Sequence, residues 1–298
     1  MNNPPAASAT GGQTARSATL PLAGRRILVT RPEGQQRQLR AAIEAAGGQA
    51  LGLPLLAIEP VADATDVDTG AAPPLRRNLQ RLREFDTLIF VSANAAEHGA
   101  KAIAAAGVEP PPTARMLAVG AATAREASLR LGRPVDSPAA ASGSEPLLEM
   151  PELADVAGRQ VAIFRGEGGR ELLARELRRR GARVTYFEVY RRVHVPDAAR
   201  RLERILAAGP VDCAIVTSIE ALQAWRELAA GGGCPIAAPF ALPLIVPSRR
   251  VAEAAERDGF GAVANAGDAG AKAMVAAAAA LFPSAKIGNP AQIAHPKE

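Results

Sequence analysis

The fold is decided by the stretch Gly24-Arg-Arg-Ile-Leu-Val-Thr-Arg-Pro-Glu-Gly34, in which a short apolar run ends in polar and turn-forming residues. The middle of the chain carries a similar stretch, Gly158-Arg-Gln-Val-Ala-Ile-Phe-Arg-Gly-Glu-Gly168. A helix-like pattern follows each of them and ends at a glycine, Gly47 in the first and Gly181 in the second. The shared Arg-x-Glu-Gly favours a real repeat over the general likeness of any two α/β halves. We therefore expect two similar α/β units of about 120 residues each.

Short apolar runs recur along the whole chain, and a helical pattern follows each of them. The pairs of predicted strand and helix are 27–30 with 33–46, 87–91 with 93–106, 116–119 with 121–131, 161–164 with 167–180, 213–216 with 218–230 and 244–246 with 248–258. Continuous apolar strands that alternate with helices are typical of a parallel sheet covered on both faces. The fold class is therefore α/β, with right-handed crossovers.

The composition bounds the size and the class of the protein. With 298 residues, 48% hydrophobic and 22% charged, the chain suits one large or two ordinary globular domains and is too apolar for a disordered protein. The net charge is +5, and arginine supplies nearly all of the positive charge, because the only lysines are Lys101, Lys272, Lys286 and Lys297. Arginine binds carboxylates and phosphates bidentately, so an anionic ligand is one interpretation and a biased genome is the other. Aromatic residues make up only 3%, which leaves few platforms for stacking bases.

Cysteine and histidine are too few for a disulfide framework or a metal site. The two cysteines are Cys213 and Cys234, and the three histidines are scattered without ligand spacing. A reducing cytoplasm fits this usage, and no apolar run approaches the length of a membrane span. Residues 1–23 lack the pattern of a secretory signal, so we interpret them as a disordered leader, and residues 283–298 as a disordered tail.

The residues that follow the predicted strands are mostly small, hydroxylic or basic. Ligands of open α/β sheets bind at the carboxyl ends of the strands, where helix N-termini also attract anions. Capping of a helix explains any one of these residues, whereas six such ends in two facing units would form a cleft of donors. The candidates are Thr30, Arg31, Ser92, Asn94, Gly120, Ala121, Thr123, Arg165, Gly166, Gly169, Thr217, Ser218 and Ser248.

Two arginines and one tyrosine have competing interpretations. Arg31 and Arg165 occupy equivalent places in the repeat, either as anion contacts or in salt bridges with Glu33 and Glu167. Residues 182–194 alternate and match 50–60 within the repeat, so each segment could run as an extended strand from one domain into the other. Tyr190 lies in the later segment and is either a weak acid or a packing residue.

No established catalytic motif is present. The chain has no nucleophile elbow, no phosphate loop and no His-Glu-x-x-His. The sequence Gly166-Glu-Gly-Gly169 follows a strand, but Glu171 stands where a dinucleotide fingerprint needs its third glycine. A dinucleotide cofactor is therefore not expected.

In combination, these segments resemble the uroporphyrinogen-III synthase family, from about Gly24 to Leu281. The order and spacing of the markers carry the resemblance. They are Val29-Thr-Arg-Pro32, Leu53-Pro-Leu55, Phe90-Val-Ser-Ala-Asn-Ala95, Ala118-Val-Gly-Ala-Ala-Thr-Ala124, Phe164-Arg-Gly-Glu-Gly-Gly-Arg-Glu-Leu-Leu173 and Val189-Tyr-Arg191.

The resemblance implies a cofactor-free, monomeric cytosolic enzyme that makes tetrapyrroles. Such an enzyme cyclises hydroxymethylbilane, which carries eight carboxylates, to uroporphyrinogen III with inversion of ring D and loss of water. It also implies two α/β domains joined by a two-stranded ladder, with the substrate in the cleft between them. Carried over to this chain, domain one is 24–55 plus 191–282 and domain two is 56–190. We also expect transient contact with the preceding enzyme of the pathway. We expect no contact with nucleic acid or membrane.

Roles for individual residues also come from the resemblance. It implies that Tyr190 is the acid for the leaving hydroxyl, that Thr123 is a donor to the substrate, and that further residues line the cleft. Those residues are Ser92, Asn94, Ser142, Thr217 and Ser218. The chain departs from the family at Val246-Pro-Ser-Arg-Arg-Val-Ala252, where a usual glycine and threonine are absent and Arg249 could supply the contacts instead.

Three other functions remain open at this point. One is an inactive regulatory paralogue, and a second is a two-lobed binding protein for an anionic small molecule. The third, a nucleic-acid binder, predicts a contiguous basic face. The arginines 175, 178, 179 and 180 lie next to acids on a predicted helix, which favours a solvated surface instead.

Overall fold

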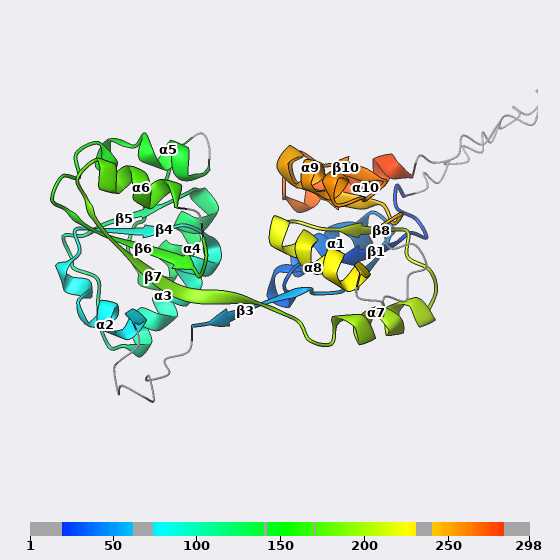
Figure 1. The fold of residues 1–298 in the computed structure, drawn as a ribbon, viewed down its shortest axis with the longest axis horizontal. Helices are drawn as coiled ribbons and strands as arrows, with labels where there is room; N and C mark the ends of the chain where they lie inside the picture. The colour runs from blue at the N-terminus through cyan, green and yellow to red at the C-terminus, as the bar shows by residue number, and fades with distance from the viewer. Residues whose placement is uncertain (1–19, 62–73, 140–141, 170, 231–239, 283–298) are drawn as a thin grey trace, which may run out of the picture. The chain divides into compact units, whose positions relative to one another are not determined.

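A computed structural model describes residues 20–61, 74–139, 142–169, 171–230 and 240–282. The chain forms two compact units, and Figure 1 labels most of their helices and strands. Unit 1 takes both ends of the chain, up to Leu55 and from Val195, and unit 2 is Leu56–His194. The second change of unit lies at His194 rather than at the predicted Tyr190, because a single strand runs on to His194.

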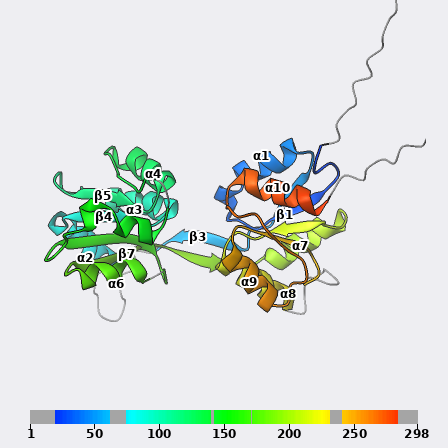
Figure 2. The ribbon, with the colours of Figure 1, turned by 90° about the horizontal axis from the view of Figure 1, so that it is seen from above.

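Unit 1 contains a five-stranded parallel sheet in the order β10-β9-β8-β1-β2. Its helices cover both faces, with α1 and α10 on one and α7, α8 and α9 on the other (Figure 2). The strands are β1 (Arg26–Val29), β2 (Gln49–Gly52), β8 (Cys213–Ile215), β9 (Leu244–Val246) and β10 (Val263–Asn265). The helices are α1 (Arg37–Ala45), α7 (Ala198–Ala207), α8 (Ile219–Ala230), α9 (Arg249–Arg257) and α10 (Ala271–Leu281).

Unit 2 contains a five-stranded sheet in the order β3-β7-β6-β4-β5, parallel except where β3 pairs with β7. Helices α2, α3 and α4 pack on one face, and α5 and α6 on the other. The strands are β3 (Leu56–Pro60), β4 (Thr87–Phe90), β5 (Arg115–Ala118), β6 (Gln160–Gly166) and β7 (Arg183–His194). The helices are α2 (Pro74–Gln80), α3 (Ala93–Ala105), α4 (Ala121–Leu131), α5 (Ser144–Leu148) and α6 (Leu172–Arg179).

The predicted α/β class with two similar sheets is confirmed, and the continuous apolar runs are indeed strands buried on both faces. The antiparallel pairing of β3 with β7 forms a two-stranded ladder, from Leu56 opposite His194 to Pro60 opposite Tyr190. The chain passes from one unit to the other at the same end of this ladder.

Four local expectations were wrong. Segment 50–60 is not one extended strand, because it breaks around Pro54, whose missing N–H cannot join a ladder, into β2 of unit 1 and β3 of unit 2. The helix expected from residue 167 begins only at Leu172, and the one expected from residue 33 begins as a single 3-10 turn, Glu33–Gln35. The predicted leader is ordered at its end, since Leu22 is fully buried in the core of unit 1. The rest of the leader, 1–19, and the tail, 283–298, lie outside the described residues.

The thiol of Cys213 is expected to resist chemical modification in the folded protein. Cys213 lies on β8 with no exposed surface, and burial raises the pKa of its thiol to about 12. At pH 8 such a pKa leaves roughly one thiol in ten thousand as the reactive thiolate. In a Cys234→Ser variant, a disulfide reagent should therefore label no thiol at pH 8 until guanidinium unfolds the protein. Rapid labelling without denaturant would contradict the buried position of this strand.

None of the helices in the described ranges is long and apolar enough to cross a membrane.

Candidate active site

The carboxyl edge of the unit 2 sheet gathers most of the predicted site residues. Strand β4 ends just before Ser92, which caps α3 by accepting a hydrogen bond from the amide of Ala95 at 3.0 Å. Asn94 is half-buried in the first turn of the same helix. Strand β5 ends just before Gly120, which begins α4. The N-termini of two helices therefore open at this edge, as expected for parallel strands that each feed a helix.

A β-bulge in β7 directs Tyr190 to this edge. Arg165 of β6 pairs with Glu188 and the next residue, Gly166, pairs with Tyr190, so β7 advances two residues where β6 advances one. Regular alternation would place Tyr190 on the same face as Tyr186, against α5 and α6. The extra residue instead turns Tyr190 to the face of Phe187, which α3 and α4 cover.

The hydroxyl of Tyr190 has two polar neighbours. Its Oη lies 3.3 Å from Ser92 Oγ, and it accepts a hydrogen bond of 3.2 Å from Arg192 Nη2. The ring itself is buried and packs on Gly166, where an added Cβ would lie only 2.6 Å from the ring carbons. Gly166 therefore serves by its lack of a side chain, which allows the close approach of the tyrosine.

His98 of α3 completes the surroundings of Tyr190. The centroid of its ring lies 5.7 Å from that of the Tyr190 ring. Burial lowers the pKa of His98, and the nearby Glu97 opposes the shift only in part. The imidazole is therefore neutral at pH 7, and the charge next to the tyrosine comes from Arg192.

The start of α4 offers backbone donors. Gly120 has no room for a side chain, because Ser142 packs over it and a Cβ there would lie 2.2 Å from Ser142 Oγ. The amides of Ala121, Ala122 and Thr123 find no acceptor among the described residues. The side chain of Thr123 is buried beside them. These groups form a set of donors suited to a carboxylate.

Arg165 is engaged within the protein, as in the second of its two interpretations, a salt bridge. The side chain is buried and donates to the carboxylate of Glu171 at 2.9 Å and to the carbonyl oxygens of Gly166 and Gly169. Its guanidinium stacks on Tyr186, whose hydroxyl donates to the same Glu171. Its partner is therefore not Glu167, and its function is to hold the loop after β6. Gly169 belongs to this arrangement, because a Cβ there would press on the guanidinium. Arg170 lies outside the described residues.

The carboxyl edge of unit 1 holds the remaining candidates. Thr30 is fully buried and donates to the carbonyl of Ile215 at 2.8 Å, so it joins β1 to β8 and is not available to a ligand. Ser218 caps α8 by accepting from the amide of Ala221, and Ser248 is half-buried at the start of α9. Thr217 is half-buried beside Ser218.

Arg31 lies at the same edge and is only partly satisfied. Its Nη2 donates to the carbonyl of Ala269, while its buried Nε has no partner among the described residues. Burial lowers the pKa of the guanidinium, and the nearby Asp268 opposes the shift. The predicted salt bridge with Glu33 is absent from the described residues, and Glu33 lies instead 3.5 Å from Arg201. The unpaired donor leaves Arg31 suited to an anion.

Arg249 faces solvent. It lies in the segment 246–252, where the sequence departs from the family pattern. Its side chain is 88% exposed and pairs with Glu253 one turn further along α9, at 2.7 Å. This is a local surface ion pair of an ordinary kind.

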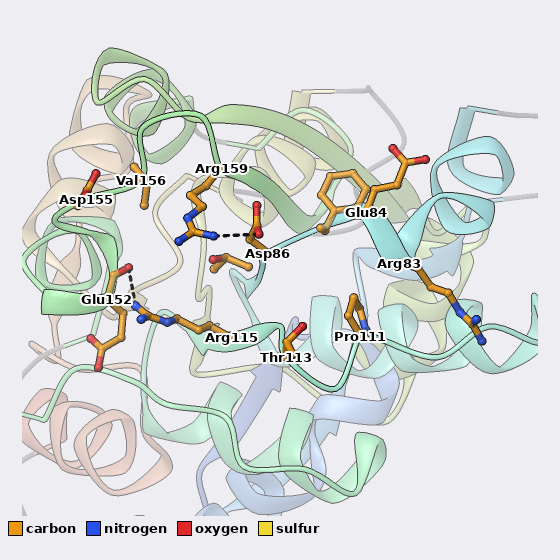
Figure 3. Close-up of a pocket in the computed structure, with 12 residues that line it drawn as sticks. Arg83, Glu84, Asp86, Pro111, Thr113, Arg115, Glu152, Asp155, Val156 and Arg159 are labelled. Atoms are coloured by element: carbon orange, nitrogen blue, oxygen red, sulfur yellow. Dashed lines mark hydrogen bonds and ion pairs between the residues drawn. The ribbon is translucent and has the colours of Figure 1, made fainter.

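The cavity shown in Figure 3 lies at the opposite edge of the unit 2 sheet, where the parallel strands begin. It has a volume of about 360 Å³, and other groups of the chain engage two of the arginines that line it. Arg159 donates to the carboxylate of Asp86 and Arg115 to the backbone carbonyl of Glu152, each at 3.3 Å. Ligands of parallel sheets bind at the other edge, so the candidate site is the one around Tyr190.

Arg192 and His98 were not among the residues selected from the sequence. Arg192 could have been found, because residues two apart in an extended strand lie on one face, and Arg192 follows Tyr190 by two. No sequence signal marks His98, because its contact with Tyr190 depends on how α3 packs on β7. No group of three potential metal ligands occurs within the described residues.

The chain matches proteins of one family. A family model described as uroporphyrinogen-III synthase HemD matches residues 37–276. The uroporphyrinogen-III synthase of Salmonella typhimurium is 35% identical over 199 residues, which are 66% of this chain and 77% of that protein. The enzyme of the same name from Escherichia coli is 33% identical over 198 residues, again 66% of this chain and 77% of that protein.

Solved structures share the fold. A crystal structure of a mutant uroporphyrinogen III synthase from Thermus thermophilus aligns with a TM-score of 0.53 at 24% identity, over 80% of this chain and 92% of that chain. One of uroporphyrinogen-III synthetase from Helicobacter pylori aligns with a TM-score of 0.51 at 14% identity, over 86% and 99%. At these identities the likeness is one of architecture.

Proposed function

This chain belongs to the uroporphyrinogen-III synthase family of tetrapyrrole biosynthesis, and we propose that it cyclises hydroxymethylbilane to uroporphyrinogen III with inversion of ring D. The reaction is that of a lyase, because water leaves as the ring closes. The observation that carries the proposal is the position of the Tyr190 hydroxyl, which stands beside the N-terminus of α3 with Ser92 and Arg192 as its neighbours.

Tyr190 is the acid in the first step. It gives its proton to the hydroxyl of the substrate, the C–O bond breaks, and water departs. The electron pair of the pyrrole nitrogen forms the new exocyclic double bond, which leaves an azafulvenium cation. Its N–H proton then passes to the phenolate, which gives the azafulvene and restores Tyr190. Ring D then attacks through its substituted position to give a spiro-pyrrolenine, which rearranges to the inverted product. Proton donation of this kind typically contributes a factor of about 10² to 10⁴ in rate.

Orientation accounts for the rest of the proposed catalysis. Hydroxymethylbilane closes unaided to isomer I, so the enzyme must hold ring D for attack at the other position. The amides of Ala121, Ala122 and Thr123 and the hydroxyls of Thr123 and Ser142 are suited to bind carboxylates of the substrate. Thr217, Ser218, Ser248 and Arg31 of unit 1 are the further candidates for such contacts.

The remaining parts of the proposal concern the setting of the enzyme. We place it in the cytoplasm as a monomer that needs no cofactor and receives its substrate through transient contact with the preceding enzyme. The low number of cysteines supports a cytoplasmic location. The labile hydroxyl of hydroxymethylbilane favours rapid transfer of the substrate from one enzyme to the next.

Isomer analysis tests the function. Purified protein incubated with hydroxymethylbilane, followed by oxidation of the products to porphyrins and separation, should yield mainly isomer III. A control without protein should yield isomer I. Isomer I alone in both samples would overturn the synthase activity and favour an inactive paralogue or a binding protein.

A further inference from the structure

Arg192 is the only charged side chain in the described residues that contacts the hydroxyl of Tyr190. Both residues lie on β7, and because they are two positions apart they share one face of the strand. Arg192 Nη2 lies 3.2 Å from the phenol oxygen, and the guanidinium carbon lies 5.4 Å from the centroid of the ring. The contact is therefore a hydrogen bond supported by the attraction of a cation to an aromatic ring.

This hydrogen bond has a consequence for the proton of Tyr190. A guanidinium can only donate, so the phenol oxygen must accept from it. The proton of the phenol then has to point away from Arg192. Ser92 Oγ lies 3.3 Å from the phenol oxygen in another direction, at the N-terminus of α3. Arg192 thereby fixes the direction in which Tyr190 can give its proton.

The positive charge acts at the next stage. When Tyr190 has given up its proton, negative charge remains on the phenol oxygen, and the guanidinium next to it stabilises that charge. The neutral His98 adds no second charge on that side.

We propose that Arg192 is a positioning residue for the acid Tyr190, acting by directing its proton and by stabilising the charge left after proton transfer. The proposal rests on the proposed function, in which Tyr190 is the acid. It assigns no contact between Arg192 and the substrate.

The neighbouring Arg191 provides a matched control. It is the same type of residue on the same strand, and it is also exposed. Its side chain pairs with Glu59 of β3, at 3.2 Å, and does not reach Tyr190. Replacing either arginine by glutamine removes one positive charge from the surface of unit 2, so general attraction of the anionic substrate changes equally in both.

The test measures kcat and KM for isomer III in single and double variants. Arg192→Gln should lower kcat about three- to tenfold with KM nearly unchanged, as expected when only the transition state loses an interaction. Arg192→Lys should recover part of the loss, because an ammonium can still donate to the phenol. Arg191→Gln should keep kcat within about twofold. Thermal unfolding of each variant shows whether the fold is intact.

A double-mutant cycle separates action through Tyr190 from direct action on the substrate. In a Tyr190→Phe background, Arg192→Gln should cause no further loss, because the hydrogen bond is already absent. An equal loss in both backgrounds, an unchanged kcat in Arg192→Gln, or a raised KM alone would each overturn the proposal. If the wild-type chain formed only isomer I, the proposed function itself would fail and this inference with it. Failure of the inference alone leaves wild-type isomer III intact.

Discussion

Replacing Tyr190 by Phe is expected to lower kcat for isomer III at least about tenfold, which corresponds to ~1.4 kcal/mol of lost transition-state stabilisation. The substitution removes the hydroxyl oxygen, which makes the hydrogen bonds to Ser92 and Arg192. It keeps the ring, which packs on Gly166. Stability should therefore change little, and the loss should appear in the chemical step. Because the substrate also closes unaided, the share of isomer I in the product should rise as catalysis slows.

Tyr186→Phe is the control for this result. Tyr186 is the only other tyrosine of the chain and lies on the same strand, but its hydroxyl donates to Glu171 and it packs on the opposite face of the sheet. Its loss should leave kcat within about twofold, as is usual for a partly exposed hydrogen bond away from the chemistry. Unchanged turnover in Tyr190→Phe would return Tyr190 to a packing role, and an equal loss in both variants would point to a structural effect.

Replacing Gly166 by Ala is expected to destabilise unit 2 and to displace the acid. The new Cβ would lie 2.6 Å from two ring carbons of Tyr190, which is closer than packed atoms can approach, so the ring must move. Overpacking of this kind costs about 1–3 kcal/mol of unfolding free energy. Because the hydroxyl moves with the ring, kcat should fall at least as far as in Tyr190→Phe. Urea unfolding and the isomer assay measure the two effects.

Removing the tyrosine ring tests whether the contact with Tyr190 causes the loss of unfolding free energy in Gly166→Ala. In a Tyr190→Ala background the clash is absent, so Gly166→Ala should change the unfolding free energy by less than about 0.5 kcal/mol. Gly34→Ala serves as the control, because a Cβ at Gly34 meets no atom within 4 Å. A cost of the same size with and without the tyrosine ring would show that the backbone, and not the contact with Tyr190, requires glycine at position 166.

Much of the fold follows from local sequence. The apolar runs at 27–30, 87–91 and 161–164 are strands because they are continuous and too short to form core helices, and their order fixes which residues stand at the carboxyl edge. The sequence predicts a helix over 121–131, and in the structure α4 spans Ala121–Leu131. The start of α6 was predicted wrongly because side-chain contacts hold the residues before it: Arg165 donates to Gly169 and to Glu171, and the helix begins only at Leu172.

The candidate site was predictable in its position and only partly in its chemistry. Ser92, Gly120 and Tyr190 were selected because they follow strands or match the family, and the structure brings Ser92 and Tyr190 into contact. Arg165 looked equivalent to Arg31 in the repeat, yet the two differ. Arg165 meets Glu171, Glu188 and Tyr186, which come from later segments, whereas Arg31 keeps an unpaired Nε among the residues that the structure describes.

What the sequence by itself determined is the α/β repeat and the edge of each sheet at which polar groups collect, because both depend on hydrophobic periodicity along the chain. Only the tertiary structure decided the direction of Tyr190. Alternation along β7 would send it to the face of Tyr186, and the bulge opposite Gly166 reverses that. A bulge arises from the pairing of two strands and from the close packing of a ring on a glycine, so no single segment contains the information for it.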